Sequence, residues 1–300
     1  MVREVACHEV DSEYLAQALD DIRTRAFGRW HDLRYGYTSG ERLRTMRDEL
    51  LDHVAAGTAG NALPDRSTRA ALRTAAECDL GLLSVGCFPN GDQEITFSFL
   101  DEKLSSDDLI LSRLAKVAPN ARTWVDTFAI CTFSGLIDES RRMVAPLLVD
   151  DFAPEIRAGV PHSELISTSA PADLAEMDAL CAYVARPPAD RPRTWPTAPL
   201  CAPDAGERAQ AAAKLDGAGP LTPDQRLLRV LLDDDRPAFE AALASRLVQH
   251  RDGQEPDPAP RTLLPLGTLA LVTLARRVHG WEPDVRSGYV PTSLLSTPTE

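Results

Sequence analysis

Apolar side chains recur at helical spacing along almost the whole chain, and this periodicity restricts the possible folds more than any motif does. Residues 38–54 give the clearest example, because Thr38 and Glu41 stand in capping-box spacing at the start of an amphipathic segment. Its apolar face carries Leu43, Met46, Leu50 and Val54. A second apolar stripe, over residues 11–27, comprises Leu15, Ala18, Leu19, Ile22 and Ala26. Similar spacing predicts further helices over residues 105–117, 171–184 and 204–216, the last with Asp204 as its N-cap and Glu207 at its third helical position.

The best-defined helix boundaries lie towards the C-terminus. Thr222 can cap a helix that starts with Pro223, and Gln225 is placed to reach back to the cap backbone. A second helix is predicted to begin near Asp235. The turn between the two helices contains Asp233, Asp234 and Asp235. Aspartate suits this place because its carboxylate accepts free N–H groups at the start of the next helix. Side chains of consecutive residues diverge, which argues against a metal site.

Evidence for strands is thin. Residues 93–100 alternate weakly after the turn-prone stretch 89–92, which allows one short hairpin. The remaining periodic segments all have helical spacing. The sequence therefore predicts an all-α fold: an irregular array of antiparallel helix pairs, repeat-like towards the C-terminus, with at most one short β-hairpin.

A proline-rich stretch interrupts the helical pattern. Residues 186–203 contain six prolines, which exclude a continuous helix. We predict an N-terminal helical region over residues 1–186, a connector over 187–203, and a C-terminal helical region over residues 204–300 that packs on the first. A single continuous domain is the alternative, since Trp195 is an unusual residue for a free linker.

The charge balance restricts the possible partners. A formal net charge of −13 repels nucleic acid and anionic membranes, and it suits either a basic protein partner or simple solubility. The longest uncharged apolar run, residues 263–275, is shorter than the roughly 20 residues of a membrane helix and is predicted to be a buried core helix. Early charges such as Arg3 and Glu4 argue against export, so we expect a cytoplasmic protein with its six cysteines as free thiols.

The sequence offers no catalytic motif of a common type: no H-E-x-x-H, no P-loop, no dinucleotide fingerprint and no G-x-S-x-G. Glu49 and His53 are four residues apart on a predicted helix, which is typical of a solvated pair. Cys131 lies in an apolar stretch and is predicted to be core. His279, at the end of an apolar helix, is predicted to contact the terminal carbonyl groups. We therefore predict no catalytic residue, no cofactor and no metal.

The order and the amino-acid sequences of several predicted helical segments resemble those of a known family. These segments are residues 43–53, 122–137, 173–184, 221–243 and 263–295. Together they resemble the immunity protein 49 family of bacterial polymorphic toxin systems. The resemblance implies a mostly helical cytoplasmic protein that binds and neutralises a cognate toxin protein. It brings no catalytic residues and no defined toxin-binding surface.

On this interpretation, an acidic helical surface docks over a basic region of the toxin, and opposite charge accelerates the association. The candidate contact residues are Asp233, Asp234, Asp235, Asp150 and Asp151, with Asp101, Glu102, Asp107 and Asp108 as further acidic positions. Each of them also fits a helix cap or a solvated turn. Two other functions stay open: a helical scaffold that binds a host protein, and an enzyme with an unrecognised site between the two helical regions.

Overall fold

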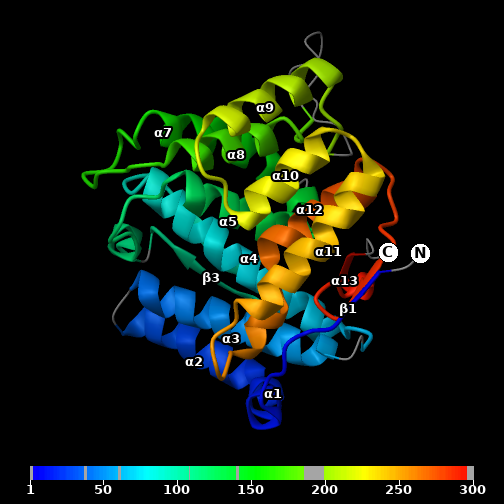
Figure 1. Ribbon diagram of the computed structural model, residues 1–300. Helices are drawn as coiled ribbons and strands as arrows, with labels where there is room; N and C mark the ends of the chain where they lie inside the picture. Colours follow the sequence, from blue (N-terminus) through cyan, green and yellow to red (C-terminus); the bar gives the residue numbers. More distant parts are fainter. Residues whose placement is uncertain are drawn as a thin grey trace.

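Helices make up most of the structure, a computed structural model that describes residues 3–36, 39–59, 62–107, 109–139, 142–185 and 199–295 (Figure 1). The first helices are α1 (Ser12–Leu19), α2 (Ile22–Tyr35), α3 (Gly40–Thr58) and α4 (Arg66–Cys87). The middle of the chain contributes η2 (Leu111–Leu114), α5 (Ala121–Phe133), η3 (Leu136–Asp138), α6 (Val144–Pro146), η4 (Leu147–Phe152), α7 (Ala153–Arg157) and α8 (Pro171–Cys181). The last are α9 (Ala205–Gly217), α10 (Pro223–Leu232), α11 (Arg236–Asp252), η5 (Pro260–Leu263), α12 (Leu266–Arg277) and α13 (Thr292–Leu295). The all-α prediction is confirmed.

Two short strand pairs accompany the helices. β2 (Glu94–Phe97) and β3 (Glu102–Ser105) form an antiparallel hairpin within the region where the sequence allowed one. β1 (Arg3–Val5) pairs in parallel with β4 (Val285–Ser287). The second pair was not predicted, because strands of three residues are too short to show alternation.

The predicted capping residues begin three consecutive helices. Asp204 accepts a hydrogen bond from the Glu207 backbone N at 2.8 Å, and the Glu207 carboxylate accepts from the Asp204 backbone N at 2.9 Å, which starts α9. Thr222 and Gln225 form the same reciprocal pair at the start of α10. Asp235 caps α11 through the backbone N of Ala238 at 3.1 Å. A side-chain cap of this kind stabilises a helix by about 1 kcal/mol.

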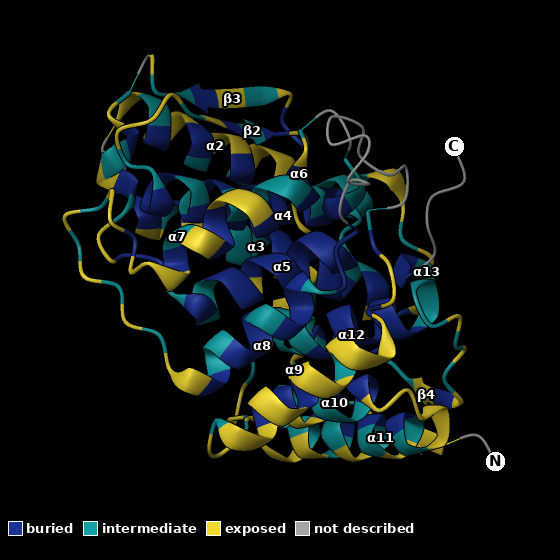
Figure 2. Ribbon diagram, turned by 90° about the horizontal axis from the view of Figure 1, so that it is seen from above, coloured by how far each residue is buried: buried dark blue, intermediate teal, exposed yellow. Residues whose placement is uncertain are grey.

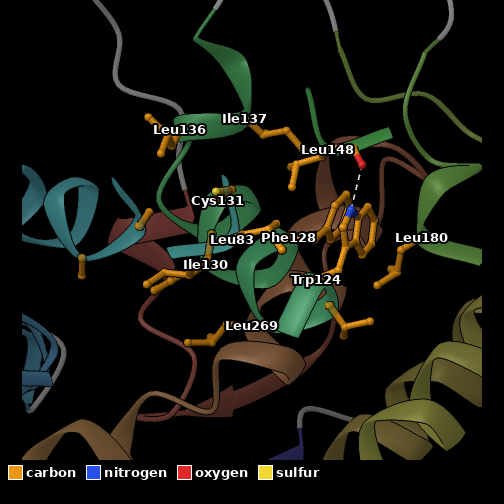
Figure 3. Close-up of a cluster of buried hydrophobic side chains, with 14 of the residues drawn as sticks. Leu83, Trp124, Phe128, Ile130, Cys131, Leu136, Ile137, Leu148, Leu180 and Leu269 are labelled. Carbon is orange, nitrogen blue, oxygen red and sulfur yellow. Dashed lines mark hydrogen bonds between the residues drawn. The ribbon is translucent and has the colours of Figure 1, made fainter. Parts of the chain in front are cut away.

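The core is centred on α4, α5 and α12, which lie in the middle of the molecule and are largely buried, while α9 and α11 expose an outer face (Figure 2). The apolar run 263–275 supplies α12, so the prediction of a buried core helix is confirmed. In α5, Trp124 stacks on Phe128 with ring centroids 5.2 Å apart, and its indole N–H donates to the Leu148 carbonyl at 2.7 Å (Figure 3). Burying such a side chain stabilises the fold by roughly 1.5–3 kcal/mol.

Two helix predictions in the N-terminal half need correction. The apolar stripe over 11–27 is split between α1 and α2 by Asp20 and Asp21, and Asp21 adopts a left-handed φ of +34°. The described residues of 105–117 form no α-helix and contain only the 3-10 turn η2. The hairpin uses the first backbone groups of this range, because Ser106 N donates to the Gln93 carbonyl at 2.9 Å. α3 begins after Ser39, and the predicted cap Thr38 lies outside the described residues.

The C-terminal helices pack directly on the N-terminal ones. α12 lies against α5, α9 and α10 lie against α8, and one cluster of buried side chains includes members of all five helices. Residues 186–198, which include Trp195, lie outside the described residues. On either side of them, Val184 and Leu200 form an isolated antiparallel bridge. This bridge holds residues 184 and 200 side by side, shortly after the end of α8.

Candidate partner-binding surface

The three aspartates of the α10–α11 turn are each engaged within the chain. Asp233 pairs with Arg229 at 2.5 Å. Asp234, at a left-handed φ of +58°, accepts from His279 Nδ1 at 2.8 Å and pairs with Arg208 at 3.1 Å. Asp235 is the cap of α11. The predicted turn is confirmed, whereas a role in partner binding stays a prediction.

The second predicted acidic pair lies elsewhere. Asp150 and Asp151 are exposed on the π-helical turn η4. Burial and the neighbouring Asp150 carboxylate raise the pKa of Asp151. η4 leads into α7, which lies far from α11 in both views (Figures 1 and 2). The structure therefore does not bring the two predicted acidic groups together. Of the further acidic positions, Asp101 and Asp107 are exposed, Glu102 is partly exposed in β3, and Asp108 lies outside the described residues.

Two histidines have surroundings other than those predicted. The His279 side chain does not contact terminal carbonyl groups; its Nε2 lies 3.1 Å from the Tyr183 hydroxyl, opposite the contact with Asp234. His53 is not a solvated partner of Glu49: it is buried, with Nδ1 3.2 Å from the Ala18 carbonyl. α1 covers this histidine, and no periodicity in α3 could indicate that. Cys131 is fully buried, as predicted.

A line of acidic and basic side chains runs from η5 to α11, and we call it the charged ladder. Its members form three groups joined by direct contacts: first Asp52, Arg261, Asp48, Arg47 and Asp79, then Asp126, Arg122, Asp173, Glu176 and Gln225, and last Asp224 with Arg246. They belong to α3, η5, α4, α5, α8, α10 and α11. The ladder therefore joins elements from both sides of the proline-rich connector.

The first half of the ladder joins η5 to α4. Arg261 Nη1 lies 2.8 Å from the Asp52 carboxylate, and Arg261 Nε lies 3.8 Å from Asp48. Arg47 then bridges two helices, with 2.6 Å to Asp48 on its own helix and 3.1 Å to Asp79 of α4. Two guanidinium groups therefore serve three carboxylates, and Asp48 contacts both of them.

In the second half, one arginine serves three acids. Arg122 of α5 lies 2.5 Å from Asp173 and 3.6 Å from Asp126, and it also contacts Glu176. The side-chain amide of Gln225, fully buried in α10, donates to Asp173 at 3.0 Å and to Glu176 at 2.9 Å. These bonds hold α5, α8 and α10 in fixed relation to one another.

The last group of the ladder, which contains Asp224, contacts the first turn of α12. Asp224 pairs with Arg246 of α11 at 2.7 Å and accepts from the Thr268 hydroxyl at 2.7 Å. A Cβ atom at Gly267 would lie 2.8 Å from the Asp224 carboxylate, so this close approach requires glycine. Asp224 begins α10 and Asp233 follows its end, so the ladder and the acidic turn lie at opposite ends of one helix, roughly 13 Å apart at 1.5 Å per residue.

The ladder holds more negative charge than it compensates, since seven carboxylates face four guanidinium groups. Burial raises the pKa of Asp79 to about 6 and the pKa of Glu176 to about 7, despite the arginine beside each. The Asp126 side chain is 64% exposed and shares Arg122 with Asp173 and Glu176. A cationic group from a partner would relieve this excess.

The sequence contains one signal of the ladder that a search for motifs does not use. Asp48 and Asp52 are four residues apart on α3, and Asp173 and Glu176 are three apart on α8. Like charges at this spacing destabilise an isolated helix, so their presence indicates that a cation from another element lies between them. Which element supplies it depends on packing between distant segments.

A catalytic interpretation gains no support from the strongest thiol candidate. Cys7 and His8 line a mainly apolar hollow of about 200 Å³ next to α3 and β4. Burial raises the pKa of the Cys7 thiol and lowers the pKa of His8, which is the reverse of an activated thiolate–imidazolium pair. Within the described ranges, no group of three or more His, Cys, Asp or Glu side chains could hold a metal ion. The six cysteines all lie in the described residues and none of them forms a disulfide, as predicted.

Comparison with known proteins gives the class of this protein. The family model described as immunity protein 49 matches residues 60–294, which extend from the loop before α4 into α13. The chain belongs to the immunity protein 49 family. No curated protein and no solved structure matches it. In the stretches of chain that the structure describes, no helix is long and apolar enough to cross a membrane.

Proposed function

We propose that this protein binds and neutralises a cognate bacterial toxin by non-covalent association in the cytoplasm of the cell that produces both. The observation that carries the proposal is membership of an immunity protein family over residues 60–294. Such a role requires no catalytic group in this chain, and the surroundings of Cys7 and His8 agree with that. It requires a surface that is already formed before the partner arrives.

The charged ladder supports this proposal as the surface for a basic partner. Its side chains are held by contacts between helices, so little conformational entropy is lost when a partner binds. Its uncompensated carboxylates would attract basic residues and accelerate the encounter. Asp126 is its most exposed ion-paired member, with 64% of the side chain accessible. The predicted contact residues Asp233–Asp235, Asp150 and Asp151 would then add to the long-range field.

The test begins with the partner. The protein, tagged at its C-terminus, is recovered from its native host, and the proteins that remain bound in a one-to-one ratio are identified. Each is then produced alone in a sensitive strain. The proposal expects one of them to arrest growth, and expects the complex to dissociate in denaturant with both masses unchanged. A partner that is not toxic, or a covalently altered partner, would replace the proposal with a scaffold or an enzyme.

A further inference from the structure

The charged ladder leads, through Asp52, to a hollow that no element of the proposed function explains. This hollow has a volume of about 280 Å³. It is lined by Tyr14, Gln17, Ala18, Arg25, Asp52, Asp257, Ala259 and Pro260. We call it the Tyr14 pocket. Its walls come from α1, α2, α3 and the segment before η5, so it forms only when these four elements pack together.

An aromatic ring and a carboxylate stand together at this pocket. Tyr14 is 37% exposed, and its hydroxyl donates to Asp257 Oδ2 at 2.9 Å. Asp257 is exposed and adopts a left-handed φ of +65°, which is costly for any residue other than glycine, asparagine or aspartate. Within the described ranges, no arginine or lysine side chain forms an ion pair with Asp257. The segment thus holds, beside a partly exposed aromatic ring, a carboxylate that forms no ion pair within those ranges.

The charge around the pocket is mainly negative. The hydrogen bond to Asp257 and its charge, followed by the charges of Asp11 and Glu13, raise the pKa of Tyr14. On the inner wall, Asp52 is already paired with Arg261. Arg25, the one cation among the described residues of the wall, donates to the Ala18 carbonyl at 3.1 Å, and its Nε is buried without a hydrogen-bond partner. Asp257 and, through their charges, Asp11 and Glu13 therefore make the surroundings of Tyr14 negative.

We propose that the Tyr14 pocket receives an arginine side chain of the protein partner. A guanidinium group stacks on an aromatic face and binds a carboxylate through two parallel N–H groups, which matches a ring beside Asp257. The volume favours a single side chain, since pockets for larger organic ligands usually exceed about 300 Å³. The inference rests on the proposed function and deepens it, because it names one anchor by which the toxin would be held.

The pocket can be tested without the toxin. The probes are acetyl-arginine amide and its neutral isostere acetyl-citrulline amide, observed by saturation-transfer NMR with the intact protein. We expect transfer to the arginine probe, and at least fivefold less to the citrulline probe. Asp257→Asn, which tolerates the left-handed backbone, and Tyr14→Ala should each reduce transfer to the arginine probe at least fivefold. The control Asp92→Asn, at an exposed aspartate outside the pocket, changes the charge equally and should leave the transfer to the arginine probe unaltered. Equal transfer in the wild type and all three variants would overturn the inference.

A second measurement separates the pocket from the proposed function. Once the toxin is identified, Asp257→Asn should raise the Kd of the complex about tenfold, while Asp92→Asn, at an exposed aspartate that is not a predicted contact residue, should change it less than twofold. If the toxin binds Asp257→Asn as tightly as it binds the wild type, the toxin does not use the pocket and the inference is wrong, although the immunity function stands. If the wild type fails to bind any toxin, the proposed function fails, and the two amide probes alone decide whether the pocket binds arginine.

Discussion

His279 at the end of α12 and Asp234 in the α10–α11 turn are joined through His279 Nδ1 and Asp234 Oδ1, which lie 2.8 Å apart. The His279 side chain is only 2% exposed, and its other ring nitrogen contacts the Tyr183 hydroxyl. Asp234 also pairs with Arg208 of α9. Asp234 therefore links the α10–α11 turn to α9 and to the end of α12, which are distant in sequence. The primary role of the three aspartates is structural.

The three aspartates should differ in their effect on stability. Asp234→Ala is expected to lower the free energy of unfolding by about 1–3 kcal/mol, because it leaves buried His279 without its carboxylate and keeps a strained backbone. Asp235→Ala should cost about 1 kcal/mol through loss of the α11 cap. Asp233→Ala should cost less than about 1 kcal/mol, as for other exposed pairs. Urea denaturation gives the order, and Asp234→Asn, which tolerates the left-handed backbone, should recover some of the loss.

His53 should make stability depend on pH. The Ala18 carbonyl accepts from Nδ1–H, and Nε2 is buried without a partner, so burial lowers the pKa of His53. The unfolded chain takes up a proton near the ordinary value of 6.5, whereas the folded chain does so only at lower pH. Stability from this group is therefore complete above about pH 6.5 and is lost as the pH falls, by up to about 1.4 kcal/mol per pH unit.

The measurement is the urea midpoint between pH 5 and pH 8. His53→Gln should reduce the fall on the acid side. The matched control is His162→Gln, because the His162 side chain is 62% exposed. The pKa values of His8 and His250 are also lowered, so the stability of both variants should still depend on pH to some extent. Parallel curves for wild type and His53→Gln would show that this histidine does not contribute.

We propose that the two helical regions unfold as one domain. α12 lies against α5, and Arg277 at its end pairs with Asp138 of η3 at 2.6 Å. Trp124 lies in the N-terminal region and Trp281 in the C-terminal region. Single-tryptophan variants that retain one or the other should report the same denaturation midpoint as far-ultraviolet circular dichroism. Separate midpoints would establish the two helical regions, residues 1–186 and residues 204–300, as independent domains.

Charge reversal should distinguish the ladder from the acidic turn as the main contact with a toxin. Asp126→Arg is expected to slow association about tenfold at low salt, because it removes one negative charge and adds a positive one where carboxylates are in excess. Asp233→Arg, at the other end of α10, should slow it about twofold through the long-range field. Stopped-flow association at two salt concentrations measures both. A larger effect at Asp233 would make the acidic turn the contact surface.

Local signals were sufficient for much of the fold. Asp204 with Glu207 and Thr222 with Gln225 define helix starts within a few residues, because capping chemistry acts over a single turn. The helix predicted over 105–117 fails because Leu111 and Leu114 have helical spacing while the preceding backbone groups extend a hairpin. Hydrophobic periodicity does not show that a hairpin competes with the helix for these backbone groups.

The candidate surface was not predictable in the same way. Arg122 and Asp173 are distant in sequence, and only the packing of α5 on α8 brings their charges to 2.5 Å. In the sequence, each is an ordinary charge on the surface of a helix. Tyr14 and Asp257 are farther apart still, and the pocket between them depends on α1 lying beside the segment that precedes η5. Sequence patterns indicate exposed acidic turns instead, because the carboxylates of such turns are adjacent in the chain.

Neutralisation by binding is the central claim, and growth of cells that produce the toxic partner tests it most directly. Cells carrying the partner alone, the partner with this protein, and the partner with the Asp126→Arg variant are compared at equal protein levels. The account predicts arrest in the first, full growth in the second and incomplete rescue in the third. Arrest in the second culture, with both proteins folded and present in equal amounts, would contradict it.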